Sequence, residues 1–317
     1  MKKESWFSSK KVSELKSKKK KNTEKIIQAS RNNDIFENQE IKENLKSFYD
    51  KEAKKYAETR KKFWHEEKAI LDEITPLFWF SPLFKEGGWK PGDFKILSPS
   101  DSSFKKEQNK KIRILEFWCG SGRFATLLNQ NFAGKFDYVW IDLSDELLSY
   151  ASKDNPDLTF FQWDITKLVR NFEQESFDLI VWTSSFQHIP TAKERSFLMK
   201  NFYRLLDYDG MLLMTNRSLS DWFVKKNWKI VMKARLKSWL RLSNNSRDLM
   251  VPRTDENWKV YERFYHFFSL KELENLTTFS WLTLKKNTFV DWNGQFTDNE
   301  KISRSSLFVA SKSPVIN

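Results

Sequence analysis

The sequence predicts an α/β fold built on a mostly parallel sheet with helices on both faces. Between residues 112 and 215, short apolar runs alternate with longer segments whose apolar residues recur at helical spacing. One loop that holds two of the chain's few glycines follows the first of these runs. Parallel strands need crossover connections, and helices in those connections cover the two faces of the sheet.

The expected strands are short and rich in β-branched and aromatic residues. They cover residues 112–117, 138–142, 158–161, 177–182 and 210–215. Helices are expected between them over about residues 123–131, 145–152 and 191–206. After a further helix near 269–278, two strands near 281–291 and 305–311 follow each other without a crossover helix. We therefore expect an antiparallel pair at one edge of the sheet.

The N-terminal third has a different residue pattern, without alternating strands and helices. From Ile41 to about Ile74, apolar residues recur at helical spacing and predict one or two helices. Proline and glycine gather in residues 75–110, which favours a loop-rich connection. The expected parts are a basic flexible arm (1–40), a helical N-terminal extension with a loop (41–110), and a main domain (111–317) with a basic insertion at 218–262.

Charge and composition limit the functional classes. The 317 residues carry a net charge of +13, concentrated in residues 1–25 and 221–247. Such blocks suit contact with phosphates, although a solvated tail and a charged helix face are the simpler alternative. The single cysteine, Cys119, excludes an internal disulfide and a cysteine-rich zinc site. We expect no metal, no membrane span and a cytoplasmic location.

The glycine-containing loop indicates a nucleotide site. It runs from Glu116 to Gly122, directly after the first expected strand and before a helix. Glycine permits close approach of the backbone to a ligand, and a helix N-terminus favours negative charge. With Gly120, Ser121 and Gly122, the loop departs from the dinucleotide pattern G-x-G-x-x-G, and its tighter rhythm suits a compact amino-acid moiety better than a pyrophosphate.

Acidic residues follow the next two expected strands. Asp142 ends the second strand, 26 residues after Glu116, and is placed to bind both hydroxyls of a ribose. Leu143 follows it. After the third strand, Asp164 is placed to reach an adenine amino group, and Ile165 to pack on the ring. The carboxyl ends of parallel strands meet at one edge of the sheet, where ligands bind in open α/β folds.

This ordered set resembles class I S-adenosylmethionine-dependent methyltransferases over about residues 110–215 and the final strand pair. The resemblance implies a Rossmann-like, seven-stranded sheet with an antiparallel last strand and S-adenosylmethionine as the cofactor. The residues that it implies for cofactor binding are Glu116, Trp118, Gly120, Ser121, Gly122, Asp142, Leu143, Asp164 and Ile165.

Tryptophan stands at several positions where this family has glycine. Trp118 replaces the first loop glycine, and Trp140 and Trp163 precede the two ligand acids in place of glycine. Trp281, before a late strand, is similar. A side chain at position 118 should crowd the cofactor, because the approach there requires a missing Cβ.

We therefore hypothesise that some of these tryptophans arise from decoding. The chain has 8 glycines and 14 tryptophans, and certain bacterial lineages read the codon UGA as glycine. UGG codons at 118, 140 and 163 would contradict this hypothesis. Trp64 and Trp258 have the character of genuine aromatic residues.

The methyl acceptor is suggested by a second resemblance, to the tRNA wobble-uridine carboxymethyl methyltransferases. It rests on the segment 45–64, on 185–190, and on Val251-Pro252 followed by 262–268. Gln187 replaces the first residue of that family's usual His-His pair, and His188 is the second. The resemblance implies that Arg60 binds the acceptor carboxylate. His188 lies where a general base would be needed for an amine or phenol acceptor.

The predicted function is thus methyl transfer to a modified tRNA uridine, with tRNA held by the basic arm and the insertion. Two alternatives stay open at this point. One is a small-molecule O- or N-methyltransferase with the insertion as a lid. The other is an inactive, RNA-binding methyltransferase fold, which applies if Trp118 is genuine.

Overall fold

The computed structural model describes residues 39–59, 65–80, 111–158, 160–164, 169–240, 245–255 and 257–313, and the side chains at 65–68 and 79–80 are not considered. The chain divides into two compact units, Met1–Asn44 and Leu45–Asn317. In the first unit, residues 39–44 are helical. Everything below concerns the second unit.

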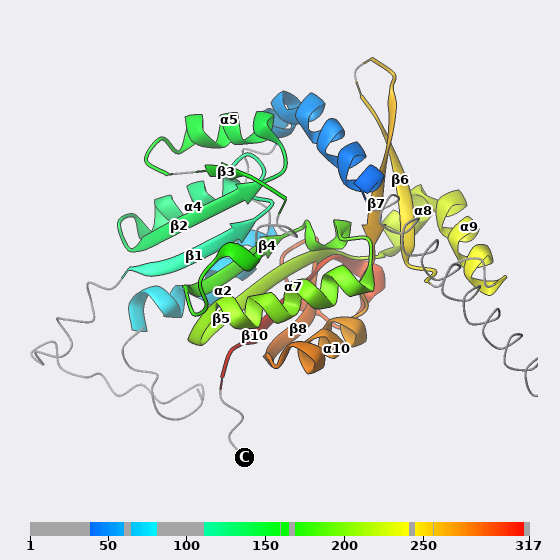
Figure 1. Cartoon of the computed structure of the whole chain (residues 1–317). Helices are drawn as coiled ribbons and strands as arrows, with labels where there is room; N and C mark the ends of the chain where they lie inside the picture. The colour runs from blue at the N-terminus through cyan, green and yellow to red at the C-terminus, as the bar shows by residue number, and fades with distance from the viewer. Residues whose placement is uncertain are drawn as a thin grey trace, which may run out of the picture. The chain divides into compact units, whose positions relative to one another are not determined.

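A single large sheet organises this unit (Figure 1). Strands β1 and β2 pair in parallel, as do β1 and β4, β2 and β3, and β4 and β5. Strand β10 runs antiparallel between β5 and β8. In sheet order the strands are β3 (Phe160–Gln162), β2 (Phe136–Asp142), β1 (Ile112–Phe117), β4 (Phe177–Thr183), β5 (Leu206–Arg217), β10 (Ser303–Ser311), β8 (Thr283–Asp291) and β9 (Phe296–Thr297). The predicted seven-stranded, mostly parallel sheet is confirmed, and the two-residue strand β9 extends its edge.

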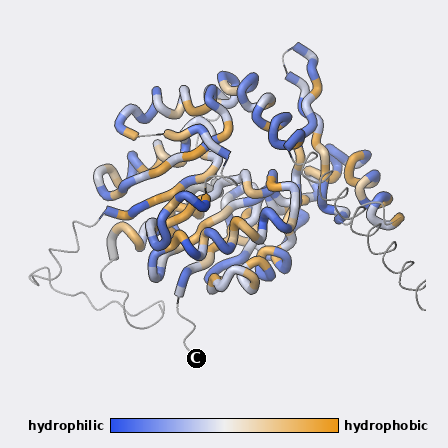
Figure 2. The backbone as a smooth tube through the Cα atoms, viewed as in Figure 1, coloured by the Kyte–Doolittle hydropathy of each residue, from blue (hydrophilic) through white to orange (hydrophobic). Residues whose placement is uncertain are grey.

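Helices cover both faces of the sheet, as predicted. Helices α7 (Ala192–Leu205) and α10 (Leu270–Ser280) pack on one face. Helices α2 (His65–Phe80), α4 (Arg123–Phe132) and α5 (Asp145–Asp154) contribute to the apolar cluster on the other. Figure 2 shows hydrophobic residues along the central strands, while the covering helices alternate between hydrophobic and hydrophilic positions.

The two faces follow from strand alternation. In β4, Ile180 and Trp182 join the cluster under α7 and α10, whereas Leu179 and Val181 join the cluster under α4. Successive side chains of a strand point to opposite faces, so a strand covered on both sides is apolar throughout. This is why the strands of the sheet read as continuous apolar runs in the sequence.

Helix α2 corrects one sequence expectation. The loop-rich connection was expected from residue 75, but the helix continues to Phe80 with Pro76 inside it. Leu77 and Phe78 pack against the core, and the Phe78 ring stacks on Phe132 at 3.9 Å. This tertiary packing outweighs the backbone hydrogen bond that a proline inside a helix removes. The rest of the expected connection, 81–110, lies outside the described residues.

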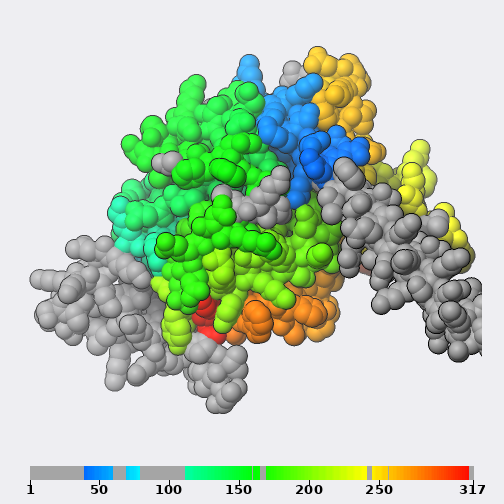
Figure 3. Space-filling model, viewed as in Figure 1, coloured from blue at the N-terminus to red at the C-terminus, as the bar shows by residue number. Residues whose placement is uncertain are grey.

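The insertion contains structure that the sequence pattern did not predict. It holds two helices, α8 (Asp221–Lys226) and α9 (Trp228–Trp239), and a two-stranded hairpin of β6 (Asp248–Thr254) and β7 (Val260–His266). These elements share a small core of their own. Figure 3 shows the hairpin beside the helical residues 45–59, and the Phe48 and Tyr261 rings meet there at 5.7 Å.

The remaining described elements are short 3-10 turns: η1 (Val169–Asn171), η2 (Phe186–His188) and η3 (Glu300–Ile302). Within the described ranges, no helix has both the length and the apolar character needed to cross a membrane.

Candidate functional site

A pocket with an empty volume of about 450 Å³ opens where strands β1, β2 and β4 end. This is the carboxyl edge of the parallel strands, at which α/β folds bind ligands. The pocket is lined by Leu45, Lys46, Tyr49, Tyr56, Trp118, Gly120, Asp142, Leu143, Ser144, Leu147, Thr183, Ser184, Ser185 and His188.

The loop after β1 shapes one side of this pocket. Its backbone is left-handed at Trp118, Gly120 and Gly122, with φ of 54°, 59° and 73°. The Gly120 N–H donates to Asp142 Oδ2 at 2.8 Å, which ties the loop to the end of β2. At Gly122 a Cβ would lie 3.0 Å from that of Ala151 on α5. Glycine at 122 therefore lets the start of α4 approach α5 closely.

Asp142 is the acidic residue of the pocket. It is 6% exposed, and its carboxylate also accepts the Ser144 N–H at 2.9 Å. Burial raises the pKa of Asp142 to about 6, although the hydrogen bonds from Ser144 and Gly120 lower it. A carboxylate held in this way at the end of β2 is suited to accept hydroxyl groups of a ribose, as predicted from its place in the sequence.

Glu116 lies beneath the loop and not among the lining residues. It is fully buried, accepting hydrogen bonds from the Tyr138 hydroxyl at 3.2 Å and the Thr183 hydroxyl at 3.3 Å. Burial raises the pKa of Glu116 to about 8, with both hydroxyls opposing the shift. The carboxyl is therefore protonated at neutral pH, and its contact with a cofactor would be made through the loop above it.

Trp118 is one of the lining residues of the pocket, and its side chain belongs to the buried apolar cluster under α7 and α10. Its ring approaches those of Trp182 and His188 at 5.7 and 6.1 Å. Its Nε1 is buried without a hydrogen-bond partner in the described part of the chain. The acid, the glycine and the strand ends thus fit S-adenosylmethionine, and the indole at 118 does not.

The other side of the pocket is aromatic. Tyr49 and Tyr56 come from the helical residues 45–59, and their rings meet at 5.5 Å. A Cβ built on Gly120 would lie 3.6 Å from Tyr56 Cε1, so this ring rests on the loop. The Tyr49 ring faces His188 at 6.5 Å, and the Tyr265 ring faces His188 at 4.5 Å. This side can enclose a planar acceptor.

His188 is held as a neutral imidazole. Its Nδ1 lies 2.6 Å from the carbonyl oxygen of Phe264, so Nδ1 carries the proton and donates it. Burial lowers the pKa of His188 to about 3, and the charge of Arg263 lowers it further, against the effect of the Phe264 hydrogen bond. With so low a pKa, His188 is a weak base at neutral pH.

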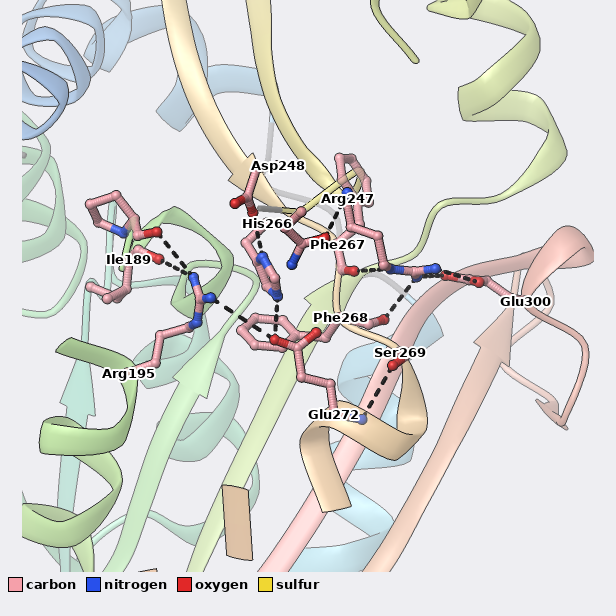
Figure 4. A network of polar contacts seen from close by, with 12 residues as sticks. Ile189, Arg195, Arg247, Asp248, His266, Phe267, Phe268, Ser269, Glu272 and Glu300 are labelled. Atoms are coloured by element: carbon pink, nitrogen blue, oxygen red, sulfur yellow. Dashed lines mark hydrogen bonds and ion pairs between the residues drawn. The ribbon is translucent and has the colours of Figure 1, made fainter. Parts of the chain in front are cut away.

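A polar network fixes the base of the β6–β7 hairpin (Figure 4). His266 is fully buried between two carboxyl groups, with Nδ1 2.5 Å from Asp248 and Nε2 2.7 Å from Glu272 on α10. Arg195 on α7 donates to the Ile189 carbonyl at 2.9 Å and lies 3.9 Å from Glu272. The network ties the hairpin to the turn that carries His188, so His266 has a structural role.

Several predicted site residues are not found among the residues that line the pocket. Arg60 and Ile165 are outside the described residues. Asp164 and Ser121 are half-buried and do not line the pocket. Gln187 makes structural contacts with the backbone. Its amide nitrogen donates to the Ser184 carbonyl at 3.0 Å, and its amide oxygen accepts a hydrogen bond from the Arg217 N–H.

Sequence reasoning did not assign a role to Arg263 or Tyr49. Both lie in the two segments that suggested the acceptor family, at 262–268 and 45–64. Only the fold shows that the hairpin and the helical residues 45–59 meet beside His188.

Comparison with known proteins supports the enzyme class. Residues 114–210 match the family model described as a methyltransferase domain. A SAM-dependent methyltransferase from Methanosarcina mazei is 19% identical, covers 68% of this chain and 98% of its own, and has a TM-score of 0.50. A TehB-like SAM-dependent methyltransferase from Corynebacterium glutamicum is 16% identical, with 84% and 97% covered and a TM-score of 0.47. None of the curated proteins matches this sequence significantly.

Proposed function

We propose that this chain, which carries a methyltransferase domain on the fold of S-adenosylmethionine-dependent methyltransferases, methylates the carboxymethyl group of a modified tRNA uridine. Arg60 and His188 were the residues predicted for the acceptor. The state of His188 is the observation that carries the proposal, together with the resemblance of segments 45–64, 185–190 and 262–268.

A carboxylate acceptor needs no general base. Its pKa is near 4, so it is ionised at neutral pH and can attack a methyl group directly. Amine and phenol acceptors must lose a proton. The only histidine in the pocket lining has a pKa of about 3 and donates its one proton to a backbone carbonyl. This favours the carboxylate over the base-dependent O- or N-methylation of a small molecule.

The residues of the pocket divide into two roles. Asp142, Gly120 and Leu143 would hold the cofactor, which supplies an electrophilic methyl group on a sulfonium. Tyr49, Tyr56 and His188 would hold the acceptor and keep water out. Methyl transfer is an in-line displacement, so alignment of the two reactants accounts for much of the rate.

The outer surface of the insertion suits RNA. Helices α8 and α9 expose Lys225, Lys226, Lys229, Lys233, Arg235 and Lys237. Trp222 and Trp228 are 48% and 57% exposed, and Lys226 lies 5.0 Å from the Trp222 ring centre. Basic side chains bind phosphates and exposed aromatic rings stack on unpaired bases. The Lys-rich residues 1–25 add charge but lie outside the described residues.

The direct test measures methyl transfer by the full chain with glycine at the three positions where the family has it. This variant combines Trp118→Gly, Trp140→Gly and Trp163→Gly. Labelled S-adenosylmethionine is offered with tRNA that carries 5-carboxymethyluridine at the wobble position. We expect label in the tRNA as an ester that mild alkali releases. The matched control is the same tRNA with an unmodified wobble uridine, which should take up none.

Other outcomes point to the alternatives. Cofactor binding with no transfer to either tRNA would contradict the proposal and favour a small acceptor. Failure of the triple variant to bind S-adenosylmethionine would defeat both enzyme interpretations and leave an RNA-binding methyltransferase fold.

A further inference from the structure

We infer that Arg263, with Tyr49, binds an anionic group of the methyl acceptor, specifically its carboxylate. The inference rests on the proposed function and names the residue that recognises its substrate. Arg263 stands on β7, directly before Phe264, whose carbonyl holds His188. Arg263 is not itself among the lining residues, but its guanidinium packs against Tyr265 and interacts with Tyr49, so it lies next to the aromatic side of the pocket.

Aromatic rings hold the guanidinium in place. Its Cζ lies 4.8 Å from the ring centre of Phe48 and 5.3 Å from that of Tyr265. The side chain also shares a hydrogen bond with the Tyr49 hydroxyl. Tyr49 lines the pocket and Tyr265 packs on His188. Flat stacking of this kind leaves the edge of an arginine, where its N–H groups lie, available for a planar anion.

The charge of Arg263 is not neutralised by the protein. Within the described residues, no carboxylate lies within ion-pair distance of it, and the ionisable groups that interact with it are three tyrosines and the neutral His188. Its Nε is buried without a hydrogen-bond partner there. A half-buried cation without a counter-ion is costly. Two other part-buried arginines differ, since Arg113 pairs with Asp178 and Arg247 with Glu300.

A carboxylate on the acceptor would supply the missing counter-ion. Arginine binds carboxylates through two parallel N–H···O bonds, which also fixes their orientation. Held between Arg263 and His188, the carboxylate would lie at the aromatic side of the pocket, across from Gly120 and Asp142 at the cofactor side. A neutral acceptor would leave Arg263 unpaired, so the same contact provides selectivity.

The test compares two nucleosides that differ in charge alone. Titration calorimetry with the full chain measures binding of 5-carboxymethyluridine and of its neutral amide, 5-carbamoylmethyluridine. We expect the acid to bind about tenfold tighter or more. Arg263→Met should remove this preference, and Arg263→Lys should retain part of it. The matched control is Arg253→Met, an exposed arginine of the same hairpin, which should keep the full preference.

The readout does not require catalysis, so its failure is separate from failure of the proposed function. Equal binding of acid and amide by the unaltered chain, or full preference in Arg263→Met, would overturn the inference. Inorganic phosphate serves as a second probe. If phosphate binds as tightly as the acid, and Arg263→Met abolishes this binding, the site recognises a phosphate of the RNA backbone and the carboxylate assignment fails. If Arg263→Met does not fold, as judged by its thermal transition, the Arg263→Lys variant decides.

Discussion

Two turns of this molecule share one hydrogen-bond pattern but differ in sequence at their second, fourth and fifth residues. One is Asp255–Lys259 at the tip of the β6–β7 hairpin, and the other is Asp291–Gln295 between β8 and β9. In both, the first residue's carboxylate accepts the N–H groups of the third and fifth residues at 2.8 and 2.9 Å. In both, the fourth N–H donates to the first carbonyl at 3.3 Å.

The difference that matters for the backbone is at the fourth residue of each turn. It is Gly294 in one turn, with φ of 82°, and Trp258 in the other, with φ of 61°. A left-handed backbone costs a residue with a Cβ about 1–2 kcal/mol. Trp258 is 87% exposed, so packing does not offset that cost. The backbone therefore does not favour the interpretation of Trp258 as a genuine aromatic residue, because glycine adopts this conformation without that cost.

The same left-handed conformation recurs at two of the tryptophans that stand where the family has glycine. Trp281 follows α10 with φ of 59°, at the helix end where glycine is most common. Trp118 has φ of 54° in the cofactor loop. Trp140 and Trp163 do not have a positive φ, so the backbone alone makes no demand for glycine there. The glycine hypothesis thus gains support at 118, 258 and 281.

The largest expected effect is at the cofactor loop. Trp118→Gly removes both the Cβ and the indole from the pocket. We expect the affinity for S-adenosylmethionine, measured by titration calorimetry, to rise at least about 100-fold, or about 3 kcal/mol. Trp118→Ala is the matched control, because it removes the ring but keeps a Cβ on the left-handed backbone. Unchanged affinity in both variants would show that position 118 does not limit binding.

Unlike the two turns, the cofactor loop lies over a buried carboxyl group, that of Glu116. The pKa of Glu116 is raised to about 8 from 4.5, so the folded state keeps a proton that the unfolded state has lost between these values. The free energy of unfolding should therefore fall by about 3–4 kcal/mol as pH rises from 5 to 8, given about 1.4 kcal/mol per pKa unit.

Denaturant titrations at pH 5 and 8 measure this fall. Glu116→Gln is the control, which should lose the part due to Glu116 and keep the smaller part due to Asp142, whose pKa is raised to about 6. An equal pH dependence in both proteins would contradict the assignment.

The smallest effect concerns the turns themselves. Trp258→Gly should raise the free energy of unfolding by about 1 kcal/mol, because it removes the left-handed penalty at an exposed site. Gly294→Ala should lower it by a similar amount. Thermal unfolding of both variants measures the pair. If the two changes had the same sign, the turns would not be equivalent and the comparison would fail.

Much of the fold was predictable from local patterns. The apolar runs at 112–117 and 177–182 identified buried strands, since a strand covered on both faces has no polar side. The glycines at 120 and 122 and the acid at 142 were placed in order by the connectivity of a parallel sheet. The course of α2 past Pro76 was not predictable, because distant packing of Phe78 on Phe132 decided it.

By itself, the sequence determined the α/β class and the place of the methyltransferase domain and its glycine-containing loop, because periodicity and the spacing of loop residues are local properties of the chain. The tertiary structure decided which residues meet. It brought Arg263 to Tyr49 from more than 200 positions away and buried His188 as a neutral imidazole. Burial and counter-ion supply depend on neighbours distant in sequence, so no local pattern encodes them.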